Sequence, residues 1–387
     1  MPPVDAVTQL LYTMADSALM PFSRYISVPQ ACRQLDGPRV SKPFRAINQF
    51  RPEVGDIEDI LPSHQLPDVP KMQGSNVSLP MRYFKGFRFS LDDKDYSELS
   101  RLGSMAQPAV LSETAEQLAL YINLSIFNDA IDQGIVWQRT DASSFSDEAA
   151  FGNNYTNGSF KTLLNNHAPM NMHFIANSDD YTNLLNLGKI SDADRRGQSD
   201  TNRSGVIGTY HGTQFLPQPG IVERNNEHWS ASQTPGINNA AGYAIGDSTL
   251  AVDGFVPAVG NLFTLTSTED VYTITDVRGV SGTESTISIF PALKEAVTDN
   301  QALTEYVTTP SLHVAQRSIA FASGIIQPSE PAGLAGSDGV RYAVRREPRS
   351  GVNIMIYRHV GYLQTIYTMC AWWGSVVDQT DGVVAVG

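Results

Sequence analysis

The chain has 387 residues, of which 41% are hydrophobic and 17% charged, a composition of folded rather than disordered proteins. Its formal net charge of −13 excludes a surface built to grip nucleic-acid phosphates, which needs clustered lysine and arginine. The sequence holds no apolar run of about 18 residues, so it predicts no membrane-spanning helix.

The charged fraction lies below the roughly 25% that is usual in soluble domains. Two explanations stay open: much of the surface is buried between subunits, or Ser, Thr, Asn and Gln supply the polar surface of a loop-rich protein. The only cysteines, Cys32 and Cys370, are far apart, which predicts a reducing compartment and no disulfide framework. The first 20 residues lack a basic leader, and we expect no secretory signal there.

The N-terminal part predicts a short helix followed by a long arm. Apolar residues at helical spacing favour a helix over residues 1–20, ended by Pro21. Residues 30–84 are rich in proline and show little helical periodicity. A loop of roughly 40 residues is too long for a passive connector, so we interpret this segment as an arm that reaches another chain. The alternative is a partly disordered insertion.

Charge is sorted along this arm, because a basic block precedes an acidic one. We take charged residues of both blocks as candidate intersubunit contacts. They are Arg39, Arg45, Arg51, Glu53, Asp56, Glu58 and Asp59.

The strongest helix signal covers residues 112–133. Its apolar stripe has spacings of three and four, typical of a helix buried on one face, and consists of Leu111, Ala115, Leu118, Ile122, Ile126 and Ala130. Thr114 and Gln117 match a capping box, and Gly134 is a plausible stop. Tyr83, Phe87 and Phe89 predict a strand before it, and residues 150–190 predict helix, strand and helix.

From 220 to 310 the pattern changes to short strands at roughly ten-residue spacing, which favours a small antiparallel barrel or sandwich. Its predicted core is Phe263, Leu265, Tyr272, Ile274, Ile287 and Ile289. A helix is then expected over 314–325, and C-terminal strands around Gly374 and residues 381–382. Trp372 and Trp373 would point to opposite faces of a strand, one into the core and one toward a partner.

The sequence carries no motif for catalysis or cofactor binding. It has neither a Gly-x-x-x-x-Gly-Lys-Ser/Thr phosphate loop nor a Gly-x-Gly-x-x-Gly turn. His167 and His173 lack the spacing of a zinc site, and His211 and His228 lie in loop-like sequence. We therefore expect no enzyme and no catalytic, cofactor-binding or metal-binding residues.

Three stretches carry a family resemblance: GDSTLAVDG…GNLFTLTS…VYTITDV…TISIFPAL (246–293), APMNMHFIANSDDYTNLL (168–185) and MCAWWGSVVDQTDGVVAVG (369–387). With the long helix, they make the chain resemble phage major capsid proteins of the Hong Kong 97 fold. More narrowly, it is similar to short-tailed-phage coat proteins with an inserted β-barrel domain. One departure is Gly260-Asn261, where that barrel's second strand commonly starts with Gly-Asp.

The resemblance implies an α+β fold with an N-arm, an extended loop, a spine helix, peripheral and axial domains, and an inserted small antiparallel β-barrel. The expected boundaries are 1–43 for the N-arm, 44–84 for the extended loop, 85–219 for the peripheral domain with the spine helix and the start of the axial domain, 220–310 for the barrel and 311–387 for the axial domain.

The resemblance also implies a self-assembling icosahedral shell. Implied partners are further copies in hexamers and pentamers, scaffolding, portal and decoration proteins, and packaged double-stranded DNA without sequence-specific binding. The implied location is the virion capsid, after assembly in the host bacterial cytoplasm. Two alternatives stay open: an acidic hydrolase with an accessory β-domain, and a phage tail or surface-layer component.

Overall fold

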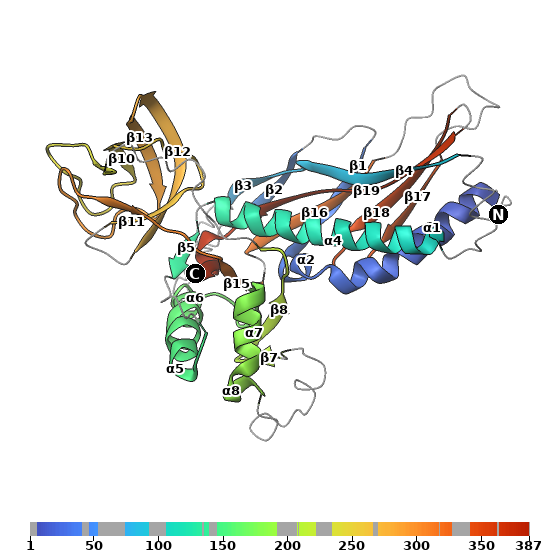
Figure 1. Ribbon diagram of the computed structural model, residues 1–387, viewed down its shortest axis with the longest axis horizontal. Helices are drawn as coiled ribbons and strands as arrows, with labels where there is room; N and C mark the ends of the chain where they lie inside the picture. Colours follow the sequence, from blue (N-terminus) through green and yellow to red (C-terminus); the bar gives the residue numbers. More distant parts are fainter. Residues whose placement is uncertain are drawn as a thin grey trace, which may run out of the picture.

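The computed structural model describes residues 6–40, 46–52, 74–92, 106–133, 135–138, 145–191, 207, 209–221, 234–265, 270–316, 318–326, 341–361 and 364–386. These residues form three parts: a long sheet with two helices on it, a smaller sheet with short helices, and a separate β unit (Figure 1). The predicted α+β class is therefore confirmed.

Strands from both ends of the chain build the long sheet. They are β1 (Arg33–Val40), β4 (Tyr83–Asp92), β16 (Ile319–Ile326), β17 (Arg341–Arg346), β18 (Asn353–Gly361) and β19 (Gln364–Val377). The central strand β19 has β4 along one edge, and β18 followed by β16 along the other. β1 runs parallel to β16, so this part of the predicted arm lies within the body of its own chain.

The predicted long helix is α4 (Ala106–Asp132). All six residues of its predicted stripe are buried, with at most 3% of each exposed. The helix begins at Ala106, so the predicted capping box is wrong. Thr114 instead lies within the helix and donates to the carbonyl of Val110 at 2.5 Å, a bond that internal threonines commonly make.

The helix α1 (Ala6–Tyr25) packs beside α4 over the same face of the sheet (Figure 1). Pro21 lies inside α1 and does not end it, which corrects the prediction. Phe22, directly after the proline, is fully buried, and this packing outweighs the one backbone hydrogen bond that proline removes. Asn123 of α4 donates to the carbonyl of Tyr25 at 2.7 Å. It also accepts, at 3.2 Å, from the amide of Val28, which is the first residue of α2 (Val28–Ala31).

Both faces of β19 are covered at its two tryptophans. Trp372 and Trp373 are fully buried, which corrects the expectation that one of them faces a partner. Trp373 donates to Ser125 Oγ of α4 at 2.9 Å, whereas Trp372 donates to the carbonyl of Met81 at 3.2 Å. β19 also runs through Gly374 without a turn, and a Cβ there would lie 2.1 Å from the carbonyl oxygen of Pro80, so glycine permits this close approach.

The smaller sheet has the order β5, β20, β15, β6, β8, β7. Its strands are β5 (Val136–Gln138), β6 (Met172–Ala176), β7 (Thr209–Tyr210), β8 (Thr213–Pro217), β15 (Ser311–Ala315) and β20 (Val383–Val386). Around it lie α5 (Glu148–Phe151), the π-helix η1 (Gly152–Phe160), α6 (Lys161–Asn165), α7 (Ser178–Asn186) and α8 (Gly188–Ser191). The short 3-10 helix η2 (Thr380–Gly382) precedes β20. The helix, strand and helix predicted over 150–190 are thus present.

The helix predicted over 314–325 is wrong, because this stretch forms β15 and β16 in two different sheets. Residues 311–387, expected to form one domain, are accordingly divided between the long and the smaller sheet. The two sheets share one core, since Leu312 and Val383 of the smaller sheet belong to the same buried cluster as Ile122 and Trp373.

The β unit has the strand order β14, β11, β12, β13, β10, β9. The strands are β9 (Gly236–Ile237), β10 (Thr249–Asp253), β11 (Leu262–Leu265), β12 (Val271–Ser281), β13 (Glu284–Phe290) and β14 (Leu303–Glu305). Gly236 bridges to Ala302, and the amide of Leu303 donates to the carbonyl of Pro235 at 2.9 Å. These contacts join the first and last strands, so the sheet closes into a small barrel within the predicted range 220–310.

The barrel has its own core and also packs on the body. All six predicted core residues are at most 4% exposed and belong to one cluster. On the outside, Trp137 of β5 donates from its indole nitrogen to Thr273 Oγ1 at 3.0 Å, and its ring meets Tyr306 edge-on at 6.4 Å. Leu262 and Val271 join the core of the body. The expectation of a purely local core is therefore too narrow.

Phe263→Ala is expected to lower the free energy of unfolding of the barrel by about 3 kcal/mol, because it removes a fully buried ring and leaves a cavity. The matched control is Val280→Ala, whose side chain is 56% exposed and which should change stability by no more than about 0.5 kcal/mol. Urea titration of the 220–310 fragment, followed by circular dichroism, measures both. Equal midpoints for the two variants would contradict the assigned core.

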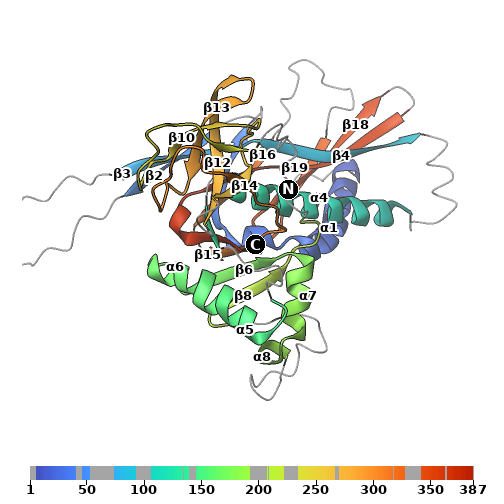
Figure 2. The ribbon, with the colours of Figure 1, turned by 60° about the vertical axis from the view of Figure 1, so that its left-hand side comes forward.

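A two-stranded hairpin projects from the body. It consists of β2 (Ala46–Pro52) and β3 (Gly74–Pro80), paired from Ala46 with Pro80 to Pro52 with Gly74. In Figure 2 the hairpin and β4 point to opposite sides of the molecule. The hairpin lies within the range predicted for the extended loop.

Candidate functional site

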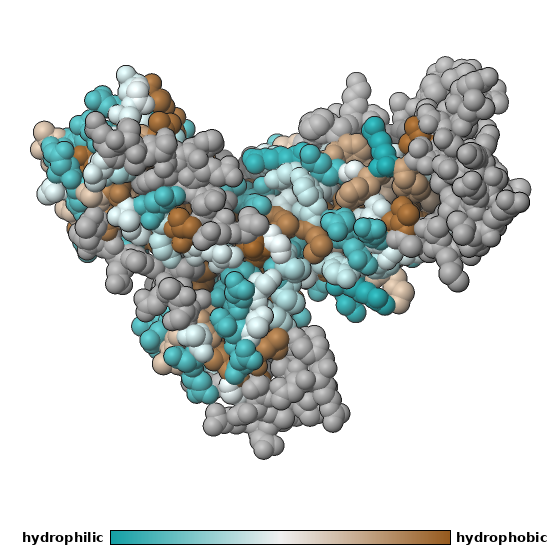
Figure 3. Space-filling view, viewed as in Figure 1, coloured by the Kyte–Doolittle hydropathy of each residue, from teal (hydrophilic) through white to brown (hydrophobic). Residues whose placement is uncertain are grey.

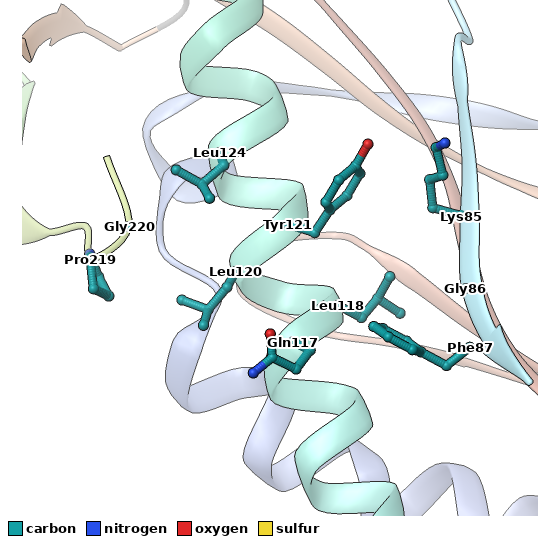
Figure 4. A pocket seen from close by; sticks show the side chains of 10 residues that line it. All are labelled: Lys85, Gly86, Phe87, Gln117, Leu118, Leu120, Tyr121, Leu124, Pro219 and Gly220. Carbon is teal, nitrogen blue, oxygen red and sulfur yellow. The ribbon is translucent and has the colours of Figure 1, made fainter. Parts of the chain in front are cut away.

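A mostly apolar groove of about 500 Å³ crosses the exposed side of α4. In Figure 4, Leu120 and Leu124 point toward Pro219 on one side of the helix, and Tyr121 points toward β4 on the other. The lining residues are Lys85, Gly86, Phe87, Gln117, Leu118, Leu120, Tyr121, Leu124, Pro219 and Gly220. Hydrophobic residues also show along this side of α4 in the space-filling view (Figure 3). Phe87 and Tyr121 are each 43% exposed, so the groove offers apolar surface to another molecule.

Trp373 of β19 contacts both elements that flank this groove. Tyr83 of β4 stacks on its ring with centroids 5.4 Å apart, and Tyr121 of α4 meets it edge-on at 6.0 Å. Offset-stacked and edge-to-face pairs are the favoured aromatic arrangements. The central strand therefore holds the helix and the edge strand at a constant separation.

A buried carboxylate reinforces the same junction. Asp129 of α4 accepts from the Tyr83 hydroxyl and from Ser375 Oγ, each at 2.6 Å. Burial raises the pKa of Asp129, and the two hydrogen bonds and nearby Arg82 oppose that rise. Burial also raises the pKa of Tyr83. Because one carboxylate links β4, α4 and β19, we assign Asp129 a structural role.

Other buried carboxylates are also part of structural contacts. Asp180 accepts from Ser311 Oγ at 2.6 Å and from Asn177 Nδ2 at 2.9 Å. Glu347 accepts from Ser23 Oγ of α1 at 2.9 Å and from the amide of Ser350. Within the described residues no carboxylate lines the groove, and no cluster of three metal-ligating side chains occurs.

A buried histidine cluster lies in the smaller sheet and was not predicted. The ring of His313 is fully buried, with Ser159 Oγ 2.9 Å from Nδ1 and Thr213 Oγ1 3.3 Å from Nε2. Tyr155 of η1 stacks on it at 5.2 Å. His173 on the neighbouring strand β6 is also buried. The sequence held no spacing signal for this cluster, because its members come from four separate elements.

Two of the seven predicted contact residues lie in the described part of the chain. Arg39 lies on β1 opposite Ile325, and Arg51 lies on β2 opposite Ser75. Arg45, Glu53, Asp56, Glu58 and Asp59 lie outside the described residues. Their role in intersubunit contacts stays a prediction.

No helix in the described part of the chain is long and apolar enough to span a bilayer. No family model and no curated protein matches the sequence.

Solved structures similar to this chain were found. A structure from Mycobacterium phage Che8 is 13% identical at a TM-score of 0.44, covering 90% of this chain and 85% of its own. The capsid structure of cyanophage P-SCSP1u is 9% identical at a TM-score of 0.45, and the match covers 91% of this chain and 86% of that chain. The structure of a virus-like particle from Pyrococcus furiosus is 9% identical at a TM-score of 0.44, and the match covers 98% of this chain and 100% of that chain.

Proposed function

We propose that this chain is a bacteriophage major capsid protein of the Hong Kong 97 type, copies of which assemble into a closed icosahedral shell around the genome. The observation that carries the proposal is the layout of the chain. A long helix lies along a sheet built from both chain ends, a second sheet with its helices sits at one end, and a hairpin projects away from the body (Figures 1 and 2). A barrel is inserted between the strands of the smaller sheet.

In this proposal the long sheet with α4 is the peripheral domain and the smaller sheet is the axial domain. The hairpin β2–β3 belongs to the extended loop and contacts a neighbouring copy. The partners are other copies in hexamers and pentamers, and further scaffolding, portal and decoration proteins. The location is the virion capsid after assembly in the host bacterial cytoplasm. The net charge of −13 suits a shell that repels packaged DNA instead of binding it.

Negative-stain electron microscopy of the purified chain tests this proposal. Closed shells of uniform size are expected, with pentameric and hexameric groups of subunits. Tubes or rings would favour a tail component, and flat lattices a surface layer. Small discrete oligomers at every protein concentration would contradict a shell and favour the hydrolase alternative.

A further inference from the structure

The strand β4 has an unpaired edge with a regular basic pattern. In the described part of the chain, β4 pairs with β19 alone. Arg82, Lys85 and Arg88 are exposed and recur at every third residue, and none of them is in an ion pair with a described carboxylate. Phe84 and Phe87 between them are 40% and 43% exposed. An exposed edge with apolar side chains is a template for adding another strand.

One segment of the sequence has the complementary pattern. Glu53, Asp56 and Asp59 also recur at every third residue, and Val54 and Ile57 lie between them. These residues lie outside the described part of the chain. Three residues of extended chain span about 10 Å, so the acidic repeat has the same length as the basic repeat, whose first member Arg82 directly precedes β4.

We propose that residues 53–60 of a second copy add to the free edge of β4 as an antiparallel strand, with Asp56 opposite Lys85. This inference rests on the proposed self-assembly. The register pairs Asp59 with Arg82, Asp56 with Lys85, Glu53 with Arg88, Ile57 with Phe84, Val54 with Phe87 and Gly55 with Gly86.

In this register acidic residues lie opposite basic ones, and apolar residues lie opposite apolar ones. Directly opposite residues of an antiparallel pair share a face, and opposite charges there are favourable. Three acidic residues meet three basic ones, and two aliphatic residues meet two phenylalanines, while Glu58 falls opposite Tyr83. A parallel strand that kept the charge pairs would set Glu58 against Phe87 and Gly55 against Phe84. The antiparallel register is therefore the one that the side chains favour.

The added strand has to come from another molecule. Pro52 ends β2 opposite Gly74, six residues before Pro80 at the end of β3, so it lies about 20 Å along the hairpin from that end. The hairpin and β4 also point to opposite sides of the molecule (Figure 2). Glu53, bonded directly to Pro52, is thus unable to lie opposite Arg88 of its own chain.

Charge exchange in the full-length chain tests the pairing. Lys85→Glu and Asp56→Lys are each expected to lower the yield of assembled particles by about ten-fold at low salt, because each sets like charges opposite in every copy. The double variant should recover most of the wild-type yield. The matched control combines Lys85→Glu with Asp59→Lys, which keeps the same net charge and should not recover it. Equal recovery in both double variants would overturn the register.

Cysteine pairs test the register in a second way. Ile57→Cys combined with Phe84→Cys should form intermolecular disulfides, visible as a ladder on a non-reducing gel. Ile60→Cys combined with Phe84→Cys, displaced by three residues, should not. The native Cys32 and Cys370 are buried, so we expect them to form no intermolecular disulfides in this test. A ladder from both pairs or from neither overturns the inference.

The outcomes separate this inference from the proposed function. Shells in the microscope without the matched ladder would overturn the strand pairing and leave the capsid assignment standing. If wild-type protein forms no shells, the capsid assignment fails. The matched ladder in smaller oligomers would then still support the pairing, and its absence would overturn it.

Discussion

The variant Ile122→Asp is expected to accumulate as insoluble protein. Ile122 lies in the middle of α4 with no exposed surface and belongs to the core shared by both sheets. An aspartate there would place an unpaired charge among apolar side chains, a change that costs several kcal/mol or more. Since typical domains are stable by only about 5 to 15 kcal/mol, this loss is enough to prevent folding.

The control for this experiment is Ile122→Val, which removes one methylene group and should cost about 1 kcal/mol. The measurement compares soluble and pelleted protein after lysis, then the circular dichroism spectrum of the soluble fraction. Soluble Ile122→Asp protein with a wild-type spectrum would show that the stripe on α4 faces solvent.

Periodicity predicted the elements in which the residues of one apolar core recur at a regular spacing. The stripe of α4 and the alternating core of the barrel were both found as predicted, because one apolar face repeats at 3.6 or 2 residues. β15 and β16 were predicted as a helix because they are buried on both sides. Leu312 and Val314 face one core and His313 the other, so the strand has no polar face to mark its period. Ala320, Ala322 and Ser323 add little β signal.

The groove was harder to predict than the fold. Its two walls, β4 and α4, both contact Trp373, which lies far later in the chain. The hydrogen bond that Trp373 donates to Ser125 of α4 joins residues 248 positions apart. No local pattern reports such a contact. The adjacent tryptophans were correctly placed on opposite faces, but no local pattern indicated that Leu79 and Met81 pack on the second face.

Acid is expected to destabilise the smaller sheet through His313. Full burial between η1 and the strands and, to a smaller extent, nearby His173 lower the pKa of His313 to about 3. Burial also lowers the pKa of His173. The unfolded chain takes up a proton near pH 6.5, whereas the folded chain stays neutral until about pH 3. Stability is therefore complete above pH 6.5 and falls as the pH falls toward 3.

The size of this effect follows from linkage. Between pH 7 and pH 5 the single histidine should cost about 2 kcal/mol, and roughly 4 kcal/mol by pH 3. The range from pH 7 to 5 is the informative one, because ordinary carboxylates titrate below it. There, urea unfolding of wild type should lose stability steadily. His313→Gln should be less stable at pH 7, since its hydrogen bonds to Ser159 and Thr213 are disturbed, but its stability should change less with pH.

The matched control for the pH experiment is His167→Gln, a histidine on the surface, which should keep the wild-type slope. The hydroxyl partners of His313 do not titrate in this range, and the ring that stacks on it, Tyr155, has its pKa raised by burial. Among the described residues, the slope between pH 7 and 5 is thus assigned to the two buried imidazoles, His313 and His173. Equal slopes for wild type and His313→Gln would show that His313 takes up its proton in the folded chain, and that the cluster opens to water without loss of the fold.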